Sequence, residues 1–181
     1  MKRLLQRVNE WHDRHPKVAL ALLGIGVIWP VLALASPWYQ LALRSDESLP
    51  DYRLFLIEKG REPQRGDLVA FVMAQASADR VQPAGPARPY TRVGLLWTKR
   101  LVGVPGDQVE VRGRQVLVNG TVVGEGLQRD RLGQPIRLAK LESPIPPGQY
   151  FMALPHPRSF DSRYYGYVRA EDLRGVVTPI W

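Results

Sequence analysis

The chain has 181 residues, enough for one ordinary domain with a short extension. It contains no cysteine, which excludes disulfide frameworks, thiol catalysis and cysteine-based metal sites. Its net charge is +8, but the basic residues are interspersed with acidic ones and form no stripe with interleaved aromatics, so we expect no nucleic-acid partner. With three histidines besides, a zinc site is not expected, and we expect no other metal and no cofactor.

An uncharged apolar run at residues 18–36 predicts a transmembrane helix. As a helix it would span about 28 Å at ~1.5 Å per residue, close to the thickness of a bilayer core. The preceding residues 1–17 carry more basic than acidic side chains, which predicts a cytoplasmic N-terminus. Residues 37–181 would then form an extracytoplasmic, periplasmic domain held in the inner-membrane lipid by a single pass.

Two other interpretations of this run stay open. Ala33-Leu34-Ala35 fits the small-x-small pattern of a cleaved secretory signal, although residues 1–17 are long for the charged region of such a signal. The run could also be a core helix of a soluble protein, which the basic cluster before it does not favour.

After the apolar run, short apolar stretches separated by Gly, Pro and Asp predict a mainly β domain with antiparallel sheets. Asn119-Gly120 predicts a type I′ hairpin turn, because both residues accept positive φ angles. The Ala/Pro/Gly-rich residues 74–92 predict an exposed loop, and the only helical feature expected after residue 40 is a turn at 170–173. The predicted strands are 53–58, 68–73, 93–102, 108–111, 115–118, 121–123 and 149–154.

Lys99 lies within the predicted strand 93–102. Alternation would place Leu95, Trp97, Lys99 and Leu101 on one face, and that face should be buried. Burial disfavours the charged form of a lysine and lowers its pKa, so Lys99 is a candidate general base. The competing interpretation is a lysine whose ammonium group reaches the edge of the sheet or pairs with a carboxylate.

A serine nucleophile needs a base within hydrogen-bond reach, and lysine can replace histidine in that role. Ser48 is the preferred nucleophile, because it follows the membrane run closely and Pro50 restrains the backbone after it. Ser45 is its competitor. His156 with Asp161 as orienter would be an alternative base, but no motif surrounds it.

Four blocks give the chain its family resemblance: Ser48-Leu-Pro50, Arg65–Phe71, Lys99–Asp107 and Ser159–Gly166. In this order they resemble type I signal peptidases, and more closely the TraF-type peptidases of conjugative transfer systems. The resemblance implies a β-rich, antiparallel signal-peptidase-like catalytic domain. The Lys99 and Ser159 blocks are the most specific part of the match.

The resemblance also implies roles for individual residues. Ser48 would be the nucleophile, and its backbone N–H would contribute to the oxyanion hole, whose second donor has no clear match. Lys99 would be the general base, and the Ser159 hydroxyl would orient it. Asp161 and Arg163 would form an ion pair that supports this segment.

Two departures favour the conjugation-type branch: Leu49 replaces a common methionine, and residues 153–158 replace the usual Gly-Asp-Asn-Arg. We therefore expect a serine endopeptidase that removes the leader of an exported precursor, such as a conjugative pilin, with hydrolysis and cyclisation both open. Its partners would be that protein substrate and the conjugation or secretion machinery. The alternative is a non-catalytic, membrane-anchored β module of such an apparatus.

Overall fold

The computed structural model describes residues 15–43, 52–80, 91, 93–130 and 132–180. Ser45 and Ser48 lie outside these residues. The chain divides into two compact units, Met1–Tyr39 and Gln40–Trp181.

The N-terminal unit contains helix α2, Pro16–Ala35, close to the predicted 18–36. Pro16 occupies the first turn, where its missing N–H costs no hydrogen bond, and the helix includes Pro30. Within the described part of the chain, α2 is the one helix long and apolar enough to cross a membrane. Its large apolar side chains are exposed, including Leu20, Trp29 and Leu34.

The second unit is built on a seven-stranded sheet with the order β1-β2-β10-β3-β4-β8-β9. The strand pairs whose register is defined, from β2 to β9, are all antiparallel. The predicted mainly β fold is therefore confirmed. The strands are β1 Tyr39–Leu43, β2 Leu54–Glu58, β3 Leu68–Val72, β4 Leu96–Gly103, β8 Gln149–Ala153, β9 Val168–Arg169 and β10 Leu173–Pro179.

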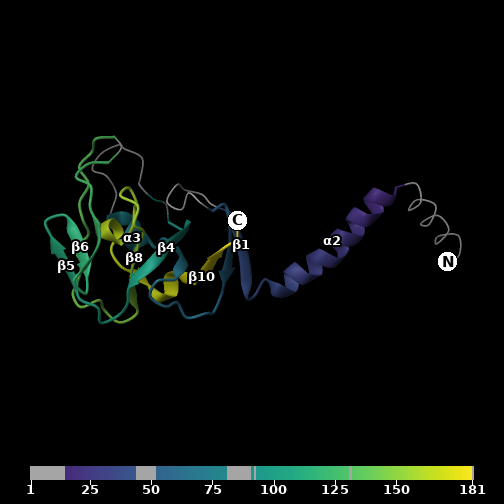
Figure 1. Cartoon of the computed structure of the whole chain (residues 1–181), viewed down its shortest axis with the longest axis horizontal. Coiled ribbons are helices and arrows are strands. Elements are labelled where there is room, and N and C mark those ends of the chain that lie inside the picture. The colour runs from purple at the N-terminus through teal and green to yellow at the C-terminus, as the bar shows by residue number, and fades with distance from the viewer. Residues whose placement is uncertain (1–14, 44–51, 81–90, 92, 131, 181) are drawn as a thin grey trace, which may run out of the picture. The chain divides into compact units, whose positions relative to one another are not determined.

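A separate three-stranded sheet contains β5 Val109–Arg112, β6 Gln115–Val118 and β7 Thr121–Glu125. Within the β unit, β5 and β6 lie at the end away from β10 (Figure 1). Asn119 and Gly120 both have positive φ, 50° and 78°, as the predicted hairpin turn requires. The small sheet packs through Val109, Val116 and Val118 against Phe151 of β8.

Several elements differ from the prediction. Strand β10 was missed although it lies between β2 and β3, because Gly175 and Pro179 weaken its strand pattern.

The predicted loop at 74–92 contains helix α3, Gln75–Arg80, which is stabilised by burial of Ala78 in the core. Strand β4 begins at Leu96 rather than at residue 93, because Gly94 has a φ of 81° and forms a turn. Strands β1 and β9 and helix α4, Ser162–Tyr165, were also missed, whereas a short 3-10 helix at Ala170–Asp172 matches the predicted turn.

Candidate active site

Lys99 lies in the middle of β4, where it pairs with Val69 of β3, and its side chain is 0% exposed. Leu101, two residues along the same face, is also 0% exposed. The Lys99 Nζ lies 5.4 Å from the centroid of the Trp97 ring, an arrangement in which the ring face attracts a cation. The predicted burial of this face is confirmed at Lys99 and Leu101, but Leu95 precedes the strand and is 47% exposed.

The segment from Ser159 to Tyr165 packs against the Trp97 end of this face. The Trp97 ring lies 6.1 Å from the Phe160 ring and 6.5 Å from the Tyr165 ring, between centroids. On β8, the neighbour of β4, the Met152 N–H donates to Ser162 Oγ at 2.9 Å. Residues that are sixty positions apart in the sequence are thus brought to one side of β4.

Ser159 is buried in this segment, at 1% exposure. Among the residues that the structure describes, its hydroxyl oxygen and Trp97 Nε1 are buried polar side-chain atoms without a hydrogen-bond partner. An unsatisfied buried polar atom costs about 1–3 kcal/mol, so native proteins retain few of them outside functional sites. The Ser159 hydroxyl therefore makes no hydrogen bond to Lys99 in this structure, and the orienting bond that the family resemblance implies stays a prediction.

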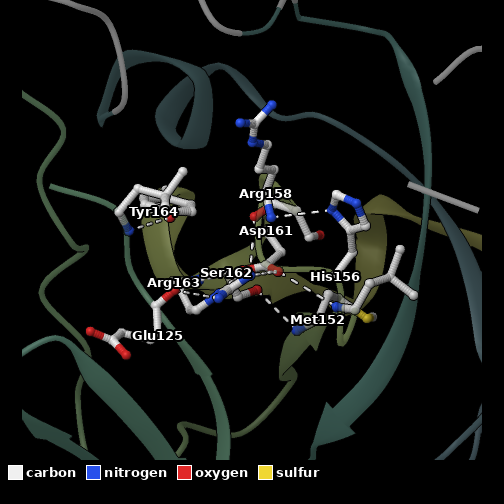
Figure 2. Close-up of polar contacts among 11 residues, drawn as sticks. Glu125, Met152, His156, Arg158, Asp161, Ser162, Arg163 and Tyr164 are labelled. Atoms are coloured by element: carbon white, nitrogen blue, oxygen red, sulfur yellow. Dashed lines mark hydrogen bonds and ion pairs between the residues drawn. The ribbon is translucent and has the colours of Figure 1, made fainter. Parts of the chain in front are cut away.

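Asp161 and Arg163 form a buried ion pair, and Figure 2 shows the two side chains side by side. Arg163 Nε donates to Asp161 Oδ1 at 2.8 Å and Nη2 donates to Oδ2 at 2.7 Å, with both side chains at most 1% exposed. Burial alone would lower the pKa of Arg163, but the hydrogen bonds and the charge of Asp161 outweigh it and raise the pKa. Asp161 also caps α4 by accepting from the Arg163 N–H.

Arg163 makes two further contacts that the sequence did not reveal. Its Nη2 donates to the Ser159 carbonyl at 3.1 Å, and its Nη1 donates to the Glu125 carbonyl on β7 at 2.7 Å (Figure 2). One guanidinium therefore links both ends of the segment 159–163, the Ser159 turn, to the small sheet.

His156 does not meet the requirements of an alternative base. It is exposed, and its Nδ1 accepts a hydrogen bond from the Arg158 N–H at 3.1 Å (Figure 2). Asp161, its expected orienter, is instead paired with Arg163. The structure thus disfavours the histidine alternative.

Arg65, at the start of the Arg65–Phe71 block, is joined by an ion pair to Asp107, at the end of the Lys99–Asp107 block. Arg65 Nη2 lies 2.7 Å from Asp107 Oδ2, and the same carboxylate accepts from the Val104 N–H and the Asn119 amide. Burial opposes the ionisation of Asp107, but these contacts together hold its pKa below the ordinary value.

Within the described residues, no group of three or more His, Cys, Asp or Glu side chains could hold a metal ion. The nucleophile assignment to Ser48, with Ser45 as competitor, and the second oxyanion donor stay predictions.

Comparison with known proteins identifies a family. Residues 14–181 match the family described as signal peptidase, peptidase S26. A probable conjugal transfer protein TraF of Sinorhizobium fredii is 29% identical over 170 residues, which cover 90% of this chain and 87% of that protein. The conjugal transfer protein TraF of Agrobacterium fabrum is 30% identical over 136 residues, 71% of this chain and 75% of that protein.

Signal peptidases are also among the similar proteins. The signal peptidase I of Leptolyngbya laminosa is 28% identical over 130 residues, which are 66% of this chain and 53% of that enzyme. The chain thus spans about half the length of this relative. A crystal structure of a signal peptidase I from Enterococcus faecalis superposes with a TM-score of 0.39 and 30% identity, covering 65% of this chain and 98% of that one.

Proposed function

The chain belongs to the signal peptidase S26 family, and we propose that it is a membrane-anchored serine endopeptidase with a Ser48/Lys99 dyad. Family membership supports peptidase activity on a protein substrate, and the two conjugal transfer relatives support a role connected with conjugation. The proposed reaction removes the leader peptide from an exported precursor, such as a conjugative pilin.

The observation that carries this proposal is the complete burial of Lys99. A protein retains a fully buried lysine at a cost, because transfer of the ammonium group from water is unfavourable. Such a position also favours the neutral amine, which is the form that accepts a proton from a serine hydroxyl. A lysine that served only to cover a sheet would leave its ammonium group at the surface.

In the proposed mechanism, Ser48 Oγ attacks the carbonyl carbon of the scissile bond while Lys99 Nζ takes its proton. The Ser48 N–H stabilises the oxyanion. Lys99 then gives the proton to the departing amine, and the acyl-enzyme is released by water, or by an amine if the product is cyclised. Ser159 orients Lys99, and the Asp161–Arg163 pair supports Ser159.

The proposed topology has residues 1–17 in the cytoplasm, 18–36 in the inner membrane and 37–181 in the periplasm. Helix α2, one apolar N-terminal helix, supports a membrane anchor. This arrangement would place the dyad on the side of the membrane where exported leaders emerge.

The test is processing of a co-expressed pilin precursor by wild type, Ser48→Ala and Lys99→Ala, read by mass spectrometry. Loss of the cleaved product in both variants at normal membrane levels supports the dyad, and the mass of the wild-type product separates linear from cyclic. Full processing by Ser48→Ala would move the nucleophile to Ser45. If neither variant changes any product, the non-catalytic module is the better description.

A further inference from the structure

Gly124 of β7 lies against the guanidinium of Arg163, whose Nη1 donates to the carbonyl of the next residue, Glu125. A Cβ atom at this position would lie 2.5 Å from Arg163 Nη1, 3.0 Å from Cζ and 3.3 Å from Nε. The register of β6 and β7 shifts beside it, between Val116 and Leu117, and Gly124 has a φ of 157°. The missing side chain thus provides the space that the guanidinium occupies.

An ordinary surface arginine could move away from an added methyl group at little cost, but Arg163 cannot. Its side chain is 1% exposed, and its three nitrogen atoms donate to Asp161, to the Ser159 carbonyl and to the Glu125 carbonyl. A shift large enough to relieve the contact would break at least one of these bonds. Because Nη2 holds the Ser159 carbonyl, Ser159 would move with the guanidinium.

We propose that Gly124 is a positioning residue for the general base, acting through Arg163 on Ser159. The inference rests on the proposed Ser48/Lys99 mechanism and deepens it. It gives the small sheet a function in the active site: β7 fixes the guanidinium, the guanidinium fixes the Ser159 turn, and Ser159 orients Lys99. Gly124 itself touches neither substrate nor reacting atoms.

Gly126 provides a control for crowding, two residues further along the chain. The three atoms nearest to a Cβ there belong to Leu138 and Arg114, and none of the three belongs to Arg163. Unlike Gly124, Gly126 is not among the glycines with positive φ, so its substitution tests crowding without that backbone strain. Gly126→Ala therefore also crowds the interior beside the small sheet, without acting on the Ser159 turn.

The experiment measures cleavage by the full chain in a mild detergent. The probe is an internally quenched peptide with alanine at the first and third positions before the cleaved bond. The variants are Gly124→Ala, Gly126→Ala, Ser159→Ala and the double variant Gly124→Ala/Ser159→Ala, each assayed for kcat and KM across pH.

For Gly124→Ala we expect kcat to fall roughly 10- to 100-fold, the size of effect that a misplacement of about 1 Å can produce. KM should stay within about twofold, because no substrate contact changes. Its pH profile should shift as that of Ser159→Ala does, and the double variant should lose no more than Ser159→Ala alone. Gly126→Ala should keep kcat within about threefold of wild type.

Additive losses in the double variant, a pH profile like wild type, or equal effects of the two glycine substitutions would overturn the inference. If Gly124→Ala alone does not fold, it is made in the Arg163→Lys background, where no guanidinium fills the space. There it should lower kcat much less than it does beside Arg163, because only the backbone strain of a side chain at a φ of 157° remains, and an equal loss in the two backgrounds contradicts the proposal.

Ser48→Ala and Lys99→Ala distinguish a failure of the proposed dyad from a failure of the positioning role of Gly124. If both retain turnover, the dyad is wrong and the role of Gly124 is wrong with it. If both lose turnover while Gly124→Ala does not, only the positioning role fails.

Discussion

Neutralising Asp161 should destabilise the β domain strongly. Asp161→Asn keeps the shape of the side chain but removes the charge that faces Arg163, in a pair whose two side chains are at most 1% exposed. A buried ion pair that loses one partner leaves the other charge in the interior without compensation, which costs about 3–5 kcal/mol. For a domain of this size, each kcal/mol lowers the unfolding midpoint by roughly 2–4 °C, so we expect a decrease of about 10 °C.

Glu110 and Arg112 provide the matched control. They are also two residues apart and form the same two-bonded arrangement, at 2.7 Å and 2.8 Å. Their side chains are 53% and 62% exposed, so water solvates either charge when its partner is removed. Glu110→Gln should leave the midpoint unchanged within error.

The assay is thermal unfolding of the full chain in detergent, followed by circular dichroism of the β domain. Equal midpoints for Asp161→Asn and wild type would refute the reasoning, since burial would then add nothing to the pair. Equal losses in the two variants would refute it as well, because the difference in exposure would have no effect.

Three further predictions concern packing, pH and the membrane. Gly103→Val should destabilise the domain by about 1–3 kcal/mol through overpacking, because a Cβ at this position would lie 2.7 Å from Ile145 Cδ1 and 2.9 Å from Phe151 Cβ. Urea unfolding measures the change, and an unchanged unfolding midpoint would contradict the prediction. Because folding lowers the pKa of Asp107, the carboxylate contributes to stability above its ordinary pKa of 3.8, and this contribution is lost as the pH falls below that value. The difference in unfolding free energy between wild type and Asp107→Asn should therefore shrink below pH 3.8. A difference that does not change with pH would contradict the prediction. The full chain should stay in the membrane pellet during alkaline carbonate extraction and a chain lacking residues 1–36 should not, whereas release of the full chain would contradict the proposed anchor.

Strand positions were predictable wherever side-chain alternation and turn residues agreed. Strand β6 matches its predicted bounds, and the Asn119-Gly120 turn has the predicted positive φ angles. Strand β10 was not predictable in the same way. A Cβ at Gly175 would collide with the Glu58 carbonyl, so the glycine is needed for a close approach of two strands, a tertiary requirement that a local pattern does not contain.

The same distinction applies to the site. The burial of Lys99 could be predicted, because it follows from alternation along one strand. The contact of Arg163 with β7 could not, because it joins segments that are 38 positions apart and depends on a side chain that Gly124 lacks. Helix α4 was missed because its four residues are too few for a periodic pattern, although Asp161 at its N-cap was an available signal.

The most direct test of the dyad is to replace Lys99 by methionine, which has a similar length and no charge, with Lys140→Met at an exposed position as control. The measurement is kcat on the quenched peptide together with the unfolding midpoint of each variant. We predict that Lys99→Met lowers kcat by about 10²- to 10⁴-fold, the usual contribution of a general base, while its midpoint stays equal to wild type or rises. Turnover by Lys99→Met equal to that of Lys140→Met would show that Lys99 is not the base and would contradict the proposed function.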